Sequence, residues 1–212
     1  HDRLTHSSIV TSNSIGEFVD RQEIDYILYD IWGNVEDQTI SRYDSIDSLI
    51  DYRVIHNEYL DPQAARRGNA THTTISRYTS NTILDSTTKI ESQEIYNQSF
   101  DTRGNIVDQR IELYVTVSGI EYLSRITIIH NSNISNSGDA YSQTIKTLIT
   151  DGEGLNPTEL SYQVLTNRAF DSDHNIKNQT ILNYLDSTTL DPTGKLILLD
   201  LQEVRNELFD SR

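Results

Sequence analysis

Hydrophobic and polar positions alternate along much of the chain. Residues 109–117 alternate along their whole length, and residues 39–43 do so more briefly. A period of two is typical of a strand with one buried face, and the Thr, Ile, Val and Tyr that fill these stretches suit a pleated surface. Residues 196–199 are continuously apolar, which predicts a strand buried on both faces. The pattern therefore predicts an all-β fold with about twelve strands.

Two segments also have helical spacing. Ile46, Leu49 and Ile50 within residues 44–52 lie three and four positions apart, and residues 198–208 would also fit a helix. Neither segment has strong capping residues, and the repeat described next aligns both with strands. We therefore expect strands in both places.

A short core, aromatic-Asp-x-x-Gly-Asn, recurs three times. The copies are residues 29–34, 100–105 and 170–175, in which the Gly is replaced by His174 in the third. The flanks repeat too: an apolar residue precedes each core, and Gln, Ile and Tyr follow it. These flanking sets are Ile24, Ile95 and Leu165; Gln38, Gln109 and Gln179; Ile40, Ile111 and Ile181; and Tyr43, Tyr114 and Tyr184. Repetition at a fixed period predicts a tandem-repeat architecture.

A weaker copy of the core lies midway through each repeat. Gly68 and Gly138 begin these copies, and parts of the same downstream pattern follow them. The chain thus divides into three repeats of about 71 residues, or six half-units of about 35, each read as a long β-hairpin. The expected units are residues 1–66, 67–137 and 138–212. Since one hairpin cannot bury its apolar face alone, the hairpins should stack into one coiled sheet or into three sandwich-like modules.

The sixth half-unit is split between the two ends of the chain. Residues 204–210 match residues 95–101, but the sequence stops before the corresponding Gly; written after Arg212, His1 would take the Gly place and His6 the Gln place. Together with the missing initiator Met and signal peptide, this favours a processed product, or a window of a longer tandem array, or a subunit whose ends complete a neighbour. A terminus that merely ends in a partial repeat is the alternative. The residues expected at such assembly ends are His1, Asp2, Leu4, Val204, Leu208, Phe209 and Asp210.

The recurrent core has the chemistry of a tight turn. An Asp at the first corner caps the turn through its side chain, and a Gly takes the positive φ that ends a type I turn with a bulge. His is among the non-glycine residues enriched at positive φ, so His174 fits the same place. The expected turn residues are Asp30, Gly33, Asn34, Asp101, Gly104, Asn105, Asp171, His174 and Asn175, with Gly68 and Gly138 in the weaker copies.

The composition excludes several classes of function. The 212 residues carry a net charge of −15, which disfavours binding to the anionic backbone of DNA or RNA. The chain has no Cys, which excludes disulfides, thiolate metal sites and thiol catalysis. Its hydrophobic content of 35% includes no run approaching the roughly 18 residues needed to cross a bilayer, so we expect no membrane insertion.

The core and its flank, residues 26–34 above all, resemble the YD repeats, the RHS-like repeats of large bacterial surface and secreted proteins. This chain differs from them in its longer period and in lacking the Arg that often follows their Gly. The resemblance implies an all-β repeat architecture and an extracellular or cell-surface setting. It implies no catalytic residue.

The sites that remain favour structure over catalysis. Asp171 and Asp173 have the spacing of a calcium loop, but Ile176 and Leu182 stand where its Gly and Glu belong, so we read a self-capped turn. The six His form no metal-spaced set, and no nucleophile elbow or phosphate loop is present. Sequons at Asn69, Asn97, Asn133 and Asn178 would allow glycan decoration. The twelve Tyr would serve either packing or a sugar-binding groove.

We therefore expect a non-enzymatic structural protein without a cofactor, which assembles end to end with copies of itself into an extracellular fibre, sheath or surface filament. The alternative is a carbohydrate-binding or adhesive module on a Tyr-bearing face. An enzyme with a diffuse site ranks last. The distinctive residues of this chain occur in every repeat, whereas an active site is usually a single place where the sequence departs from the repeat.

Overall fold

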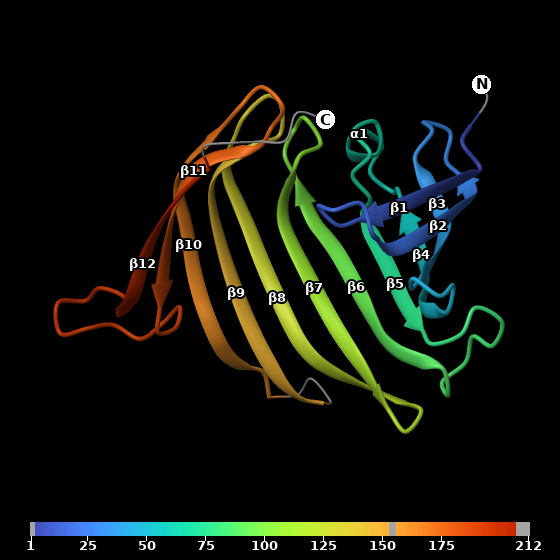
Figure 1. Ribbon diagram of the computed structural model, residues 1–212. Coiled ribbons are helices and arrows are strands. Elements are labelled where there is room, and N and C mark those ends of the chain that lie inside the picture. The colour runs from blue at the N-terminus through green and yellow to red at the C-terminus, as the bar shows by residue number, and fades with distance from the viewer. Residues whose placement is uncertain (1–2, 153–155, 207–212) are drawn as a thin grey trace.

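The computed structural model describes residues 3–152 and 156–206 (Figure 1). Over these residues the chain is nearly all β and forms one antiparallel sheet whose twelve strands pair in chain order. The strands are β1 (His6–Ser12), β2 (Phe18–Tyr29), β3 (Val35–Tyr43), β4 (Leu49–Glu58), β5 (His72–Tyr78), β6 (Lys89–Phe100), β7 (Ile106–Val117), β8 (Ile120–Ile134), β9 (Ala140–Gly152), β10 (Thr158–Phe170), β11 (Ile176–Tyr184) and β12 (Leu198–Arg205). The predicted all-β fold of successive hairpins is confirmed.

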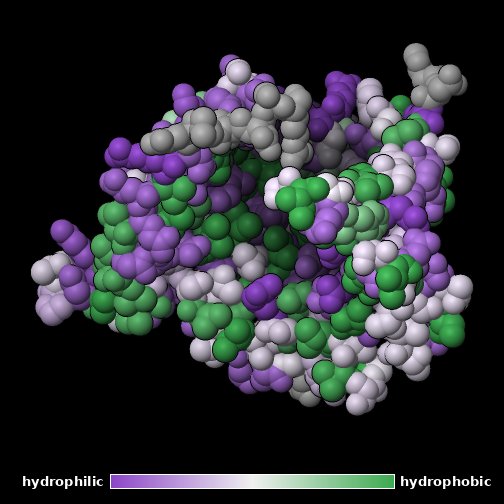
Figure 2. Space-filling model, viewed as in Figure 1, coloured by the Kyte–Doolittle hydropathy of each residue, from purple (hydrophilic) through white to green (hydrophobic). Residues whose placement is uncertain are grey.

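The sheet is continuous and open. Each strand pairs only with its neighbours in sequence, so β1 and β12 each have a single partner. Figure 1 shows the sheet curved into a trough, with β1 at one side and β12 at the other. The face toward the viewer in Figure 2 is hollowed, and hydrophobic residues gather inside the hollow. Of the two expected arrangements, the chain forms the single coiled sheet.

The two segments with helical spacing are not helices. Residues 44–48 form a turn that leads into β4, and β12 begins at Leu198. The expectation that residues 196–199 are buried on both faces is wrong, since Leu198 is 47% exposed and Leu199 is 61% exposed. An edge strand lacks the second neighbour that would cover these side chains.

One short helix, α1 (Pro62–Ala65), was not expected. It replaces the tight turn between β4 and β5. The Asp61 side chain caps it by accepting from the backbone N–H groups of Gln63 (2.9 Å) and Ala64 (2.8 Å), and a proline occupies the first turn. Ala64 and Ala65 are buried, and their small side chains let the turn at Gly104 lie against the helix.

The Asp-x-x-Gly-Asn cores form capped hairpin turns. In the first, the Asp30 carboxylate accepts from the backbone N–H groups of Trp32 (2.8 Å) and Asn34 (2.8 Å) and from the Asn34 side-chain amide (2.8 Å), while Gly33 has φ +93°. The Asp101 and Asp171 turns repeat these bonds, and His174 adopts φ +65° in the glycine place. The Asp171 segment is thus a self-capped turn. Four further turns have the same closure, at residues 13–17, 44–48, 135–139 and 191–195.

A row of branched apolar side chains crosses the sheet. In each of the five hairpins that the repeat predicts, an apolar residue of the first strand lies directly opposite an isoleucine of the second. These pairs, called here the isoleucine row, are Ile24–Ile40, Ile55–Ile75, Ile95–Ile111, Ile129–Ile145 and Leu165–Ile181. Directly opposite residues share a face of the sheet, so the row lies on one face. Nearly all of its members are half-buried, as befits a single layer.

Candidate functional site

The two open edges of the sheet are the main candidate for function. β1 exposes Ile9 (49%) and Val10 (58%), and β12 exposes Leu198 and Leu201 (53%). An edge strand also presents a row of unpaired backbone N–H and C=O groups, which is a template for pairing with another strand. The described residues therefore leave two such templates, one at each end of the strand order.

One hydrogen bond shows which backbone N–H and C=O groups of β1 point away from β2. Thr5 accepts at its carbonyl from the N–H of Tyr26 (3.0 Å), the residue opposite it. In an antiparallel ladder, residues that bond to the partner alternate with residues whose backbone groups point away. Ser7, Ile9 and Thr11 therefore bond to β2. The N–H and C=O groups of His6, Ser8 and Val10 point out of the sheet.

β12 presents the complementary set. The N–H of Asn206 donates to the carbonyl of Lys177 (2.8 Å), which lies opposite it in the β11–β12 register. By the same alternation, Gln202 and Val204 bond to β11. The backbone groups of Leu201, Glu203 and Arg205 then point outward. Each edge therefore has three residues, at every second position, whose backbone groups are free to bond another strand.

The structure places two of the expected assembly residues. Leu4 is 58% exposed and its carbonyl accepts a hydrogen bond from the Tyr29 hydroxyl, while Val204 is half-buried in β12. His1, Asp2, Leu208, Phe209 and Asp210 lie outside the described residues. His6 does not take the Gln place: Ser7 lies opposite Ile24, as Gln38 lies opposite Ile55. Counting across the chain ends misplaced β1 by one residue, which would turn every side chain to the other face.

The hairpin turns and α1 also bind one another along one end of the sheet. The Asn34 side-chain amide donates to the Ala65 carbonyl (2.6 Å), and Asn69 donates likewise to Gly104 (2.8 Å). Further along, His174 Nδ1 contacts the Asp139 carboxylate at 2.9 Å. Each partner lies 31 to 35 residues from its donor, close to one half-unit. Asn34 and Asn69 thus link half-units, a role that their turn positions alone did not reveal.

Each histidine in the described part of the chain sits beside a carboxylate, which the sequence analysis missed. The pairs are His6–Asp25 (2.8 Å), His56–Asp37 (2.7 Å), His72–Glu94 (2.5 Å), His130–Asp108 (2.6 Å) and His174–Asp139 (2.9 Å). Four of these pairs join neighbouring strands, so only a register would have revealed them. Within residues 3–152 and 156–206, no three His, Asp or Glu side chains group as metal ligands would.

Two groups, His6 and Asp171, give stability a defined pH dependence. The hydrogen bond that the His6 ring donates to the Asp25 carboxylate raises the pKa of His6, so the His6 contact stabilises the fold below the usual His pKa of about 6.5 and is lost as pH rises through the shifted value. The turn carboxylate Asp171 has its pKa lowered, first by the Asn175 side chain, so its contribution is lost as pH falls below about 4.

We expect the urea midpoint of unfolding to rise as pH falls from 8 to 6 and to drop again below about pH 4. His6→Gln should flatten the rise between pH 8 and 6 and leave the drop below about pH 4 unchanged. An unchanged rise in this variant would show that the His6–Asp25 contact does not contribute.

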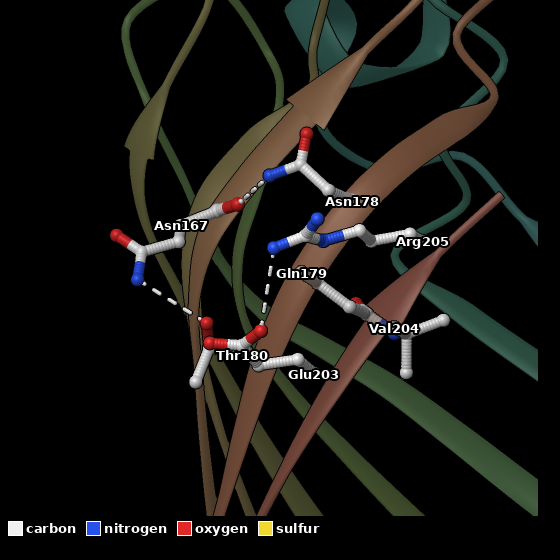
Figure 3. A pocket seen from close by; sticks show the side chains of 7 residues that line it. All are labelled: Asn167, Asn178, Gln179, Thr180, Glu203, Val204 and Arg205. Carbon is white, nitrogen blue, oxygen red and sulfur yellow. Dashed lines mark hydrogen bonds and ion pairs between the residues drawn. The ribbon is translucent and has the colours of Figure 1, made fainter. Parts of the chain in front are cut away.

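Two hollows on the surface are candidate ligand sites. The larger, about 410 Å³, contains Tyr96 and Tyr114. Its carboxylates are already paired, since Glu121 binds Lys89 (2.8 Å) and Glu94 binds His72. The other, of about 190 Å³, lies beside β12 (Figure 3). It follows from an extra residue in β10 near Asn167, whose φ is +51°. The side-chain amides of Asn167 and Asn178 bond to their neighbours, whereas Gln179 Oε1 is buried without a hydrogen-bond partner. A single unpartnered side-chain oxygen does not by itself define a ligand site.

The four sequons differ in availability. The side-chain amides of Asn69, Asn97 and Asn178 donate to backbone carbonyls at 2.6 to 2.8 Å. Asn133 is exposed, so a glycan would attach there without breaking such a bond.

The described residues include no helix long and apolar enough to cross a membrane. Comparison of the whole sequence with protein-family models found no matching family, and comparison with curated proteins found no relative.

Proposed function

We propose that this chain is a structural subunit that assembles end to end into an extracellular fibre, sheath or surface filament. The observation that carries the proposal is the pair of open edges, each with outward backbone groups and exposed apolar side chains. The resemblance to repeats of bacterial surface proteins supports the extracellular setting.

The geometry of the sheet suits repeated addition. Every strand pair is antiparallel, and because the sheet has an even number of strands, β12 runs opposite to β1. A second copy in the same orientation would therefore meet β12 with an antiparallel β1. Such a head-to-tail contact leaves a new β12 edge open, which is the condition for an open filament rather than a closed pair.

Charge restrains other contacts between copies. The net charge of −15 makes lateral association of filaments unfavourable at moderate salt. Backbone hydrogen bonds between edges are short-range and survive this repulsion, so growth along the strand order is favoured over clumping.

Electron microscopy and light scattering of the purified chain over a range of concentrations test the proposal. We expect filaments of uniform width with an axial repeat, and growth that depends on concentration. A compact monomer at every concentration would contradict it.

A further inference from the structure

The internal repeat specifies how one copy would join the next. We infer that Val204 of one copy lies directly opposite Ile9 of the next copy, so that the isoleucine row continues across the joint. This inference rests on the proposed end-to-end assembly and adds to it a single strand register and the residues that define it.

The first step is that Ile9 belongs to the isoleucine row. It stands two residues after Ser7, which faces Ile24, just as Ile40 stands two residues after Gln38, which faces Ile55. The same relation holds at every later half-unit, so Ile9 has the place of Ile40, Ile75, Ile111, Ile145 and Ile181. Unlike those five, which are half-buried, Ile9 is 49% exposed. None of the described residues lies opposite it on its outer side.

The second step is that Val204 has the complementary place. It lies opposite Gln179, as Ile129 lies opposite Gln109 and Ile55 opposite Gln38. In each hairpin, the residue in this place pairs on its other side with a row isoleucine. Val204 is the one described member of its set without such a partner.

The third step is that the backbone permits this register. The outward groups of Arg205 and Glu203 would face those of Ser8 and Val10, so the hydrogen bonds across the joint are satisfied. Moving the strand by one residue would set outward groups against inward ones and turn side chains to the wrong face. Movement by two residues keeps the bonds but places Val204 opposite Ser7 or Thr11, which breaks the row.

The absence of Cys in this chain makes a cross-linking test specific. Val204 and Ile9 would form a non-hydrogen-bonded pair, with Cα atoms about 4.5 Å apart, within the range that a disulfide spans. Two single variants, Ile9→Cys and Val204→Cys, are mixed at a concentration that gives filaments and then mildly oxidised. We expect a disulfide-linked dimer of twice the 24.2 kDa chain mass.

Ser7→Cys and Thr11→Cys, each mixed with Val204→Cys, are the matched controls on the same face of β1. These two control mixtures should give no more disulfide-linked dimer in filaments than they give as unassembled chains. If filaments form but a control pair gives the most dimer, or no pair gives any dimer, the proposed register is wrong. The proposal that the chain forms filaments would still stand in either case. The absence of filaments from the wild-type chain would instead contradict the proposed function.

Discussion

Gly104→Ala is expected to destabilise the fold far more than Gly33→Ala, although the two glycines hold the same place in two copies of the turn. Both have positive φ, +83° and +93°, so each substitution costs about 1–2 kcal/mol of backbone strain. At Gly33 an added Cβ would meet nothing within 4 Å. At Gly104 it would lie 2.6 Å from the Gln63 carbonyl oxygen and 2.8 Å from the Ala64 nitrogen.

Those atoms belong to the backbone of α1 and cannot rotate away. Overpacking of this kind adds about 1–3 kcal/mol, so we expect Gly104→Ala to lower the free energy of unfolding by about 2–5 kcal/mol in total. Urea denaturation followed by circular dichroism compares the two variants. Equal losses would show that α1 does not lie against the Asp101 turn.

A pair of prolines in β1 is expected to block assembly while the fold survives. Ser8→Pro together with Val10→Pro removes two N–H groups that point out of the sheet, so the hydrogen bonds from β1 to β2 remain. At a joint the facing carbonyls would lose their donors, at about 3 kcal/mol in total, which corresponds to an assembly concentration about 100-fold higher.

Light scattering gives the assembly concentration, and circular dichroism confirms the fold. Ile9→Pro is the control, because its N–H donates to β2, and this variant should lose stability as a monomer. If the double variant assembles at the wild-type concentration, the edge of β1 is not part of the joint.

The repeat allowed much of this fold to be predicted. Because the aromatic-Asp-x-x-Gly-Asn core dictates a capped turn at each copy, hairpin positions and the all-β class followed from the sequence. The helix α1 could not be predicted in this way, because its capping residue Asp61 lies outside the recurrent core. The burial expected for residues 196–199 failed because hydrophobicity does not reveal which strand lies at an edge.

Predicting the candidate site required the pairing register of the strands as well as the repeat pattern of the sequence. The sequence predicts that the two ends form one split half-unit, and counting across them assigns His6 to the place that Ser7 holds in the structure. The signal that would have corrected this was Ile9, which fits the Ile places of the other half-units. The histidine–carboxylate pairs join residues 19 to 35 positions apart, four across neighbouring strands and one between two turns, which no local motif encodes.

Amide hydrogen exchange on dilute and assembled samples is the most direct test of strand addition at the open edges. The outward amides of Ser8, Val10, Glu203 and Arg205 should exchange rapidly in the monomer and become protected in filaments. The inward amides of Ile9 and Val204 should be protected in both. Filaments in which the outward amides still exchange at the monomer rate would contradict the account.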